Sequence, residues 1–137
     1  MFTSDGIHNA SGTCVVIGER MASVLLKAVY GKPGSFAPSI RRIEQPDERR
    51  IQLHFDGDHV LRSMDDLASG LNIEDEKGIM DCVSINVSDK GVIVTAERDI
   101  GENAVFHAYW KREEPAFFLR DVYGMPMLAC FNVKIEK

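Results

Sequence analysis

Short segments of alternating apolar and polar residues follow Pro33 to the end of the chain, and this alternation most limits the possible fold. In residues 49–55, for example, Ile51, Leu53 and Phe55 are separated by polar residues. Such alternation places the apolar side chains on one face of a β-strand. Residues typical of turns separate these segments at a spacing of about ten residues, which favours an antiparallel β-sandwich. We expect strands at residues 39–44, 49–55, 59–62, 71–74, 81–87, 92–97, 103–110, 116–119 and 128–135.

A tight turn is expected between two of these strands. Asp56, Gly57 and Asp58 are turn-forming residues between segments 49–55 and 59–62. Their position predicts that the two segments form a β-hairpin.

One segment near the N-terminus has the periodicity of a helix instead. Apolar residues between Thr13 and Tyr30 recur every three or four positions, as on one helical face. Gly31 suits the position that ends a helix, and Pro33 cannot continue it. The predicted fold class is mainly β (α+β), with this N-terminal helix packed on an antiparallel β-sandwich. We expect a single domain over residues 1–137, with a loop and helix in 1–33 and a β-module in 34–137.

The composition fits a globular protein that needs neither a metal nor a disulfide to fold. The chain has 137 residues, of which 45% are hydrophobic and 27% charged, so it can bury a core. Cys14, Cys82 and Cys130 lie far apart and form no C-x-x-C pair, and the spacing of the histidines favours no metal site. We therefore expect three buried free thiols in a reducing compartment, no metal and no cofactor.

Charge and hydropathy exclude two classes of partner. The net charge is −5 and the basic residues form no cluster, so we expect no nucleic-acid binding. The longest apolar run, around residues 24–29, is too short to cross a membrane. Residues 1–6 lack the basic and apolar regions of a signal peptide, which predicts a cytoplasmic location for the chain as written.

A candidate catalytic motif lies at the N-terminus. Asp5, Gly6, Ile7 and His8 form a D-x-x-H sequence. In serine hydrolases a histidine takes the proton of the nucleophilic hydroxyl, and an aspartate orients the imidazole and stabilises its cationic form. This pair of residue types therefore indicates the acid and base of a triad.

The residues after this motif resemble the last block of SGNH-type carbohydrate esterases of the sialate O-acetylesterase family. In that family an Asp-x-x-His loop precedes a helix containing Gly-Glu-Arg-Leu-Ala and ending in Tyr-Gly. Residues 18–22 (Gly-Glu-Arg-Met-Ala) and 30–31 (Tyr-Gly) are similar and stand at matching distances. Further segments up to Phe131 match the family in order, so the resemblance covers nearly the whole chain.

The resemblance implies that Asp5 and His8 are the acid and base of an esterase triad. It also implies that the Gly-Asp-Ser nucleophile block and the oxyanion-hole residues lie N-terminal to this segment, and the chain does not contain them. We therefore expect a stand-alone C-terminal module without activity of its own. Two alternatives stay open: a β-sandwich module that binds a carbohydrate or small ligand, and a fragment that supplies Asp5 and His8 to a complementary esterase chain. A full-length parent could be exported.

Two aromatic residues are candidates for ligand binding. Tyr109 and Trp110 are neighbours on an expected strand, so their side chains point to opposite faces and only one needs to be buried. An exposed aromatic ring can stack on a sugar, which makes Trp110 the first candidate for contact with a carbohydrate. The alternative is that these aromatics fill the core.

The predicted helix has an apolar face that needs a cover. In a full-length esterase of the resembling family this face would pack on a parallel sheet that the chain does not contain. It could fold onto the β-module, pair with a second copy or meet a separate chain, and an exposed face would be an association site. We expect a homo-oligomer, with an interface formed by Val16, Ile17, Met21, Val24, Leu25 and Val29.

Overall fold

The structure is a computed structural model that describes residues 11–63, 68, 70–88, 91–110 and 119–137, without the side chains of residues 11–13. Asp5 and His8, the candidate catalytic pair, lie outside the described residues. One helix and nine strands follow in the order α1 (Ser11–Ala28), β1 (Ile40–Glu44), β2 (Arg50–Phe55), β3 (Leu61–Arg62), β4 (Leu71–Asp75), β5 (Gly78–Ser88), β6 (Gly91–Ala96), β7 (Val105–Ala108), β8 (Arg120–Asp121) and β9 (Cys130–Glu136).

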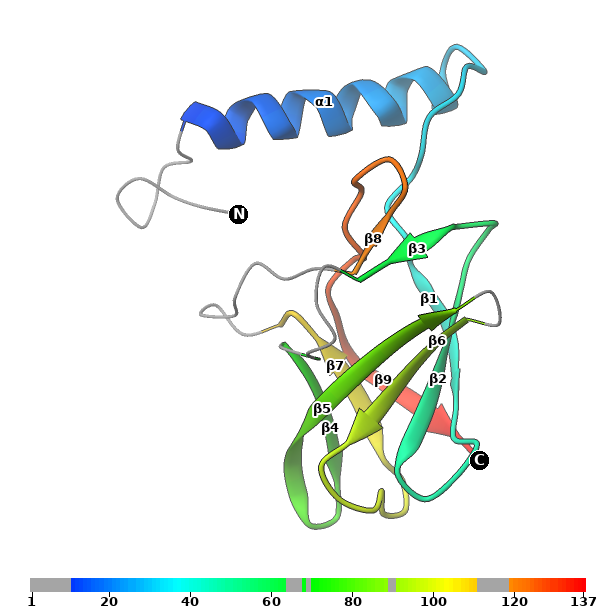
Figure 1. Cartoon of the computed structure of the whole chain (residues 1–137), viewed down its shortest axis with the longest axis vertical. Helices are drawn as coiled ribbons and strands as arrows, with labels where there is room; N and C mark the ends of the chain where they lie inside the picture. The colour runs from blue at the N-terminus through cyan, green and yellow to red at the C-terminus, as the bar shows by residue number, and fades with distance from the viewer. Residues whose placement is uncertain (1–10, 64–67, 69, 89–90, 111–118) are drawn as a thin grey trace.

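Seven strands form a closed barrel in the order β1-β2-β6-β5-β4-β7-β9 (Figure 1). Neighbouring strands are antiparallel except for β1 and β9, which pair in parallel with Ile43 opposite Ile135. This pair joins the first and last strands of the barrel, and the Gln45 N–H extends it by donating to the Glu136 carbonyl at 2.8 Å.

The prediction of a sandwich was therefore wrong, although a mainly β fold is correct. Strands in a sandwich and in a barrel bury one face, so both produce the same alternation of residues. The barrel follows from the β1–β9 pairing and from the bend of β5, whose register shifts between Cys82 and Ser84. Because of this bend, β5 pairs with β4 through its first residues and with β6 through the rest.

The apolar residues expected to face inward form the core of the barrel. Ile51 and Leu53 are 0% and 1% exposed, as their alternation in β2 indicates. This core includes Ile43, Ile51, Leu53, Leu71, Ile73, Met80, Ile85, Val92, Val94, Ile100, Phe106, Leu119, Met127 and Ile135.

The hairpin predicted between residues 49–55 and 59–62 does not form. β3 instead pairs with β8, with Leu61 opposite Asp121, in a two-stranded sheet outside the barrel. The turn at Gly57 exists, with a φ of 77°, but it carries the chain away from β2. Turn residues alone therefore indicated the change of direction and not the partner strand.

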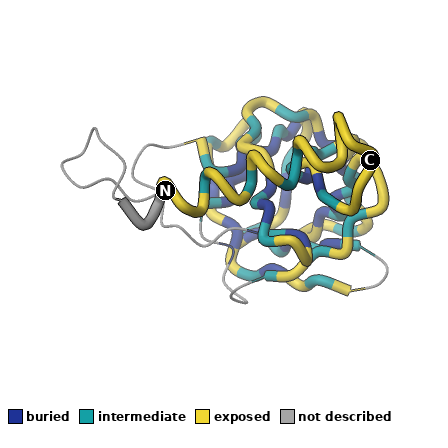
Figure 2. The backbone as a smooth tube through the Cα atoms, turned by 90° about the horizontal axis from the view of Figure 1, so that it is seen from above, coloured by how far each residue is buried: buried dark blue, intermediate teal, exposed yellow. Residues whose placement is uncertain are grey.

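Helix α1 was expected to pack on the β-module, and this prediction was also wrong. It crosses above one end of the barrel (Figure 1), and much of its length is exposed when seen from above (Figure 2). Its end agrees with the sequence, because Gly31 has a φ of 59° and the Lys32 N–H donates to the Leu26 carbonyl at 2.9 Å, closing the last turn. Within the described chain, no helix has the length and apolar character needed to cross a membrane.

Candidate functional site

The apolar residues of α1 divide into a half-buried set and an exposed set. Ile17 and Val24 are half-buried and face the rest of the molecule. Met21, Leu25 and Val29 are 61%, 50% and 66% exposed, which is unusual for large apolar side chains on one short helix. The structure therefore leaves most of the predicted interface uncovered.

One sector of the exposed surface of α1 carries no charge, and the exposed residues Glu19 and Lys27 lie outside it. At 3.6 residues per turn, its residues span roughly 160° of the helix surface, and Glu19 lies just beyond one edge. We call this surface the α1 face; it consists of Cys14, Val15, Gly18, Met21, Ala22, Leu25, Leu26, Ala28 and Val29, all of them exposed. An apolar surface of this extent typically marks an association site.

The linker after α1 holds the opposite side of the helix. The Ser35 N–H donates to the Ser23 hydroxyl at 2.9 Å, and the Lys27 ammonium lies 5.1 Å from the centre of the Phe36 ring. These contacts fix one side of α1, so the α1 face points away from the linker.

An apolar groove separates α1 from the segment before β9. It has a volume of about 430 Å³ and is lined by Arg20, Met21, Val24, Leu25, Ala37 and residues 125–129. Burial beside this groove lowers the pKa of Arg20, and the nearby Arg120 guanidinium lowers it further. The helix thus touches the barrel end along one edge without sealing against it.

Ser35, His59 and Asp121 lie close together, but they are not arranged as a catalytic triad. The Ser35 hydroxyl donates directly to the Asp121 carboxylate, and His59 Nδ1 lies 3.9 Å from the same carboxylate. Asp121 also accepts the N–H groups of Tyr123 and Met125 at 2.9 and 2.8 Å. Because the Ser35 hydroxyl donates to a carboxylate and not to an imidazole, this cluster does not make the serine a nucleophile. It instead ties the linker to β8.

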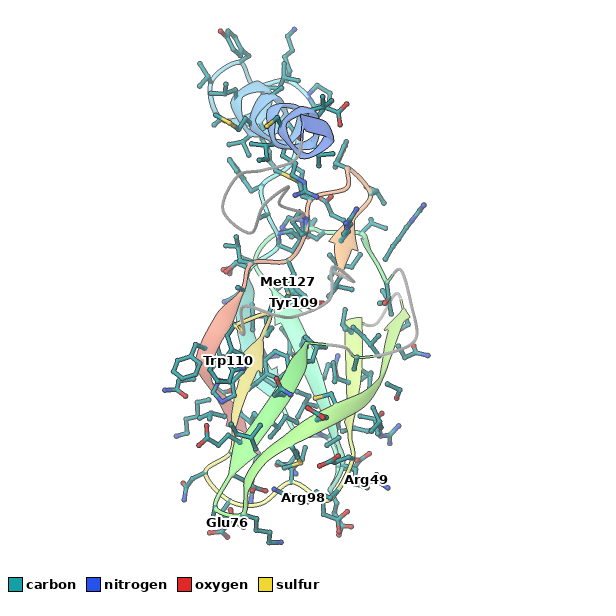
Figure 3. The ribbon with its side chains drawn as sticks, turned by 90° about the vertical axis from the view of Figure 1, so that its left-hand side faces the viewer. Arg49, Glu76, Arg98, Tyr109, Trp110 and Met127 are labelled. Carbon is teal, nitrogen blue, oxygen red and sulfur yellow. The ribbon has the colours of Figure 1, made fainter. Side chains whose placement is uncertain are left out.

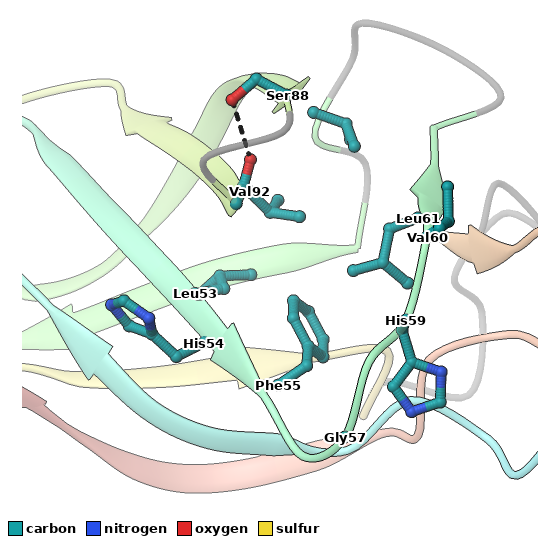
Figure 4. Close-up of a pocket in the computed structure, with 11 residues that line it drawn as sticks. Leu53, His54, Phe55, Gly57, His59, Val60, Leu61, Ser88 and Val92 are labelled. Carbon is teal, nitrogen blue, oxygen red and sulfur yellow. Dashed lines mark hydrogen bonds between the residues drawn. The ribbon is translucent and has the colours of Figure 1, made fainter.

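A hollow of about 480 Å³ opens beside the ends of β2 and β6 (Figure 4). Its walls carry both polar and apolar groups, with Phe55 between its two histidines, His54 and His59. His54 Nε2 lies 2.8 Å from Glu44 Oε2, while His59 belongs to the cluster around Asp121. Across the described residues no group of three or more His, Cys, Asp or Glu side chains could hold a metal ion.

A second polar cluster lies on the outer surface of the sheet formed by β5, β4, β7 and β9. His107 is fully buried, and its ring packs against Trp110 and Phe131 with centroids 5.4 and 4.7 Å apart. The Asn132 N–H donates to His107 Nδ1 at 3.2 Å, so Nε2 carries the proton of the neutral ring and donates to Glu74 Oε2 at 3.2 Å. Both ring nitrogens therefore have partners.

Asn72 lies beside His107 on the adjacent strand and is 3% exposed. Its Nδ2 donates to Asp81 Oδ1 at 2.6 Å, whereas its buried Oδ1 has no hydrogen-bond partner in the part of the chain that the structure describes. We call Asn72, Glu74, Asp81, His107, Trp110 and Phe131 the outer-face cluster. No sequence motif indicates it, because its members come from four strands and from the segment just after β7, and they meet only through the tertiary structure.

The two predicted ligand-binding aromatics take different roles. Tyr109 packs against the core, and its hydroxyl oxygen accepts the Leu119 N–H at 3.1 Å. Trp110 is 39% exposed and lies on the outer side of β7 and β9 (Figure 3). The structure thus leaves Trp110 partly exposed and uses Tyr109 within the fold; ligand binding by either stays a prediction.

Comparison with known proteins places the fold and overturns the resemblance to esterases. No family model matches this sequence. No curated protein matches it either. The chain is similar to solved structures of a bacterial S-layer protein, SbsC. A structure of its domains 1–6 matches 92% of this chain at 13% identity with a TM-score of 0.52.

Two further structures give the same result. The S-layer protein rSbsC(31-844) matches 74% of this chain at 13% identity with a TM-score of 0.52, and the N-terminal part of SbsC matches 74% at 14% identity with a TM-score of 0.50. This chain spans only 14% to 24% of the length of the three matched chains. At such identities the likeness shows the fold alone.

The predicted relationship to sialate O-acetylesterases was therefore wrong, and so was the function inferred from it. The solved structures similar to this chain are parts of a surface-layer protein, and none is an esterase. The resemblance rested on short pieces such as residues 18–22 and 30–31. Pieces of that length also occur where a helix ends in glycine and β-strands follow, whatever the chemistry of the protein.

Proposed function

We propose that this chain is an assembly module, in which the barrel presents α1 and the α1 face pairs with the α1 face of a second copy. The observation that carries the proposal is the uncharged, exposed surface of the helix. Burying exposed apolar side chains stabilises association by about 25 cal/mol per Å² of apolar surface. A second copy supplies the same uncharged surface, and a symmetric pair buries both at once.

The shape of the α1 face favours another helix as its cover. Gly18 and Ala22 lie near its middle, one turn apart, and a Cβ added to Gly18 would have no atom within 4 Å. Small residues at such positions let the backbones of two helices approach closely. Larger residues on either side, such as Met21 and Leu25, can then pack around the contact.

The helix alone provides a modest interface. Its 18 residues extend over about 27 Å, which is short for a dimer held by one helix pair. Exposed apolar residues of the neighbouring segment extend the surface: Leu128 lines the groove beside α1 and is 52% exposed. We therefore expect an association that depends on protein concentration in the micromolar range, about −8 kcal/mol.

The similar solved structures add support of a limited kind. All three belong to an S-layer, or surface-layer, protein, which has a structural role. A module that contributes to a protein layer needs contacts between copies and needs no catalytic site. For this chain such a role would favour the cell surface over the cytoplasmic location expected from the sequence, and cell fractionation with immunodetection distinguishes the two.

Sedimentation velocity over a concentration series tests the proposal. We expect the wild-type chain to shift from monomer to dimer, and Ala22→Glu to stay monomeric because it places a charge in the middle of the α1 face. Val83→Glu is the matched control, since Val83 is 46% exposed on β5, away from α1. A wild-type chain that stays monomeric throughout, or equal dimerisation by Ala22→Glu, would refute the proposal.

A second variant separates a helix partner from a lipid surface. Gly18→Leu adds apolar area but blocks close approach of another helix, so it should weaken dimerisation and would strengthen adsorption to vesicles. Flotation of the chain with phosphatidylcholine vesicles, increased by Gly18→Leu, would show that the α1 face binds lipid and that the proposal is wrong.

A further inference from the structure

We propose that the outer-face cluster binds a guanidinium group, either of an arginine side chain in a partner or of a free guanidino compound. This inference is independent of association through α1. It rests on an unpartnered acceptor, on two carboxylates and on two exposed aromatic rings that strand register brings together.

Strand register places the polar members of the cluster side by side. Asn72 stands opposite Asp81 of β5 and opposite His107 of β7. Leu71 and Ile73, on either side of Asn72, point into the core, so the Asn72 side chain lies on the outer face of β4. Glu74 follows two residues later on the same face.

The amide of Asn72 leaves one acceptor unused. Its Nδ2 is directed at Asp81, so the planar amide directs Oδ1 away from that carboxylate, where it has no partner. Reversing the amide would put its oxygen against the Asp81 carboxylate, so the hydrogen bond supports this orientation. His107 cannot supply the missing donor, because Asn132 and Glu74 occupy its two nitrogens. A buried acceptor in this state favours a ligand that brings donors.

The charges around this acceptor favour a cation. The hydrogen bonds of Glu74 and Asp81 to described side chains go to His107 and Asn72, neither of them a permanent cation. Lys134 is the nearest described lysine on this face, opposite Val105, which places it two strands from Glu74, about 10 Å away. Among the described residues, these two carboxylates therefore have no hydrogen bond with an arginine.

The aromatic rings narrow the choice of cation. Trp110 and Phe131 are 39% and 56% exposed, and their centroids are 5.1 Å apart. A guanidinium is planar, stacks on aromatic faces and carries five N–H donors, whereas an ammonium carries three and does not stack. Carboxylates accept from a guanidinium in pairs. Because Asn72 is 3% exposed, the ligand first meets Glu74 and Trp110 and reaches Oδ1 only when neighbouring side chains move aside.

The single tryptophan of the chain makes the test direct, because all tryptophan fluorescence comes from Trp110. Methylguanidinium at millimolar concentration should change this fluorescence saturably and bind at least tenfold more tightly than methylammonium. A Gly-Arg-Gly peptide that binds more tightly than methylguanidinium identifies an arginine-bearing partner as the source; equal affinity identifies a free guanidino compound. The monomeric Ala22→Glu variant should give the same affinities, which separates this test from the association test.

Two variants define the role of the cluster. Glu74→Gln should weaken methylguanidinium binding about tenfold while keeping a hydrogen-bond acceptor for His107. Asn72→Leu should remove the preference for methylguanidinium over methylammonium. Glu48→Gln is the control for loss of one exposed carboxylate elsewhere, between β1 and β2, and it should leave the affinity unchanged.

Several results would overturn the proposal. The proposal fails if methylguanidinium gives no saturable change in fluorescence, or if methylammonium or the uncharged sugar N-acetylglucosamine gives an equal response. It also fails if Glu74→Gln keeps full affinity. If Asn72→Leu fails to fold, Glu74→Gln still decides the question, because the Glu74 side chain is 45% exposed and is not part of the core.

Discussion

Gly34 lies directly against the carbonyl group of Ser23: a Cβ built on Gly34 would come within 2.3 Å of the Ser23 oxygen. The atom in the way is backbone and cannot rotate aside. Next to it, the Ser35 N–H donates to the Ser23 hydroxyl. The linker and α1 therefore meet at a point where only glycine fits, and this contact fixes the direction of the α1 face.

Gly34→Ala should loosen α1 without unfolding the barrel. The added Cβ must push the linker from the helix, so the contacts of Ser35 and Phe36 with α1 weaken. Hydrogen–deuterium exchange should show faster exchange in residues 14–28 and unchanged protection at Ile51 and Val94. No increase of exchange in α1 would show that the contact does not hold the helix. Faster exchange in the barrel as well would show that the effect is not confined to α1.

Asp75 and Arg98 form an ion pair with a buried carboxylate, at the end of the barrel away from α1 (Figure 3). The Asp75 side chain is 0% exposed and accepts two guanidinium N–H groups at 2.6 and 2.8 Å, and the Gly101 and Lys77 N–H groups at 2.9 and 2.8 Å. Asp75→Asn should lower the free energy of unfolding by roughly 3 kcal/mol, near the low end for a buried pair because Arg98 is partly exposed. Urea unfolding at pH 7 measures this loss of stability.

The same residue predicts a pH dependence. The hydrogen bond with Arg98 holds the pKa of Asp75 far below its usual range, so the folded state prefers the carboxylate. The stabilisation is complete above the unfolded pKa of about 3.9 and is lost as the pH falls toward the folded pKa. The difference in stability between wild type and Asp75→Asn should therefore shrink between about pH 5 and pH 2. Asp47→Asn, at an exposed ion pair with Arg50, should change little at any pH.

The three cysteines should react with thiol reagents at very different rates. The expected burial of all three thiols was wrong for Cys14, which is exposed. Burial, together with the charges of Asp81 and Glu97, raises the pKa of Cys82 to about 12. A rise of about three pKa units from the usual value lowers the thiolate fraction near pH 8 roughly a thousandfold. Burial also raises the pKa of Cys130. With dilute folded protein, Ellman's reagent should react quickly with one thiol, and this fast reaction should be absent in Cys14→Ser. In urea all three thiols should react. Fast reaction of Cys82 in the folded protein would contradict its place in the barrel core.

The register between β4 and β5 predicts a contrast between two isoleucines. Ile73 is 0% exposed in the core, and Ile79 is 49% exposed on the neighbouring strand. Ile73→Ala should cost about 2–5 kcal/mol because it leaves a cavity, whereas Ile79→Ala should change stability by about 0.5 kcal/mol or less. Urea unfolding of both variants checks the pairing, because a shift of β4 by one residue would turn Ile73 outward.

Much of the fold could be predicted from local pattern. The alternation of Ile51 and Leu53 identified β2 and its buried face, and Gly31 marked the end of α1 within a few residues. The partner of each strand could not be read in the same way. β3 pairs with β8 across more than fifty residues of sequence, and no turn residue carries information over that distance.

For the candidate sites, too, single residues could be picked out from the sequence, whereas their spatial partners could not. The sequence singled out Trp110 as the aromatic to examine for exposure, but it gave no sign of Asn72, Asp81 or Glu74, which Trp110 joins only through the β5-β4-β7 register. The Asp5 and His8 motif supported an esterase through short matches alone. Such matches describe residue types along the chain and do not include the spatial partners that catalysis requires.

The sequence by itself determined that this protein is mainly β, where most strands and one helix lie, and which faces of the strands are apolar, because periodicity and turn chemistry act over a few residues. Only the tertiary structure decided that the strands close into a barrel through Ile43 and Ile135, that α1 stands over one end with its apolar face uncovered, and that Asn72 keeps an unpaired oxygen. These features depend on contacts between residues distant in sequence, whose energies are set by packing and strand register and leave no local pattern.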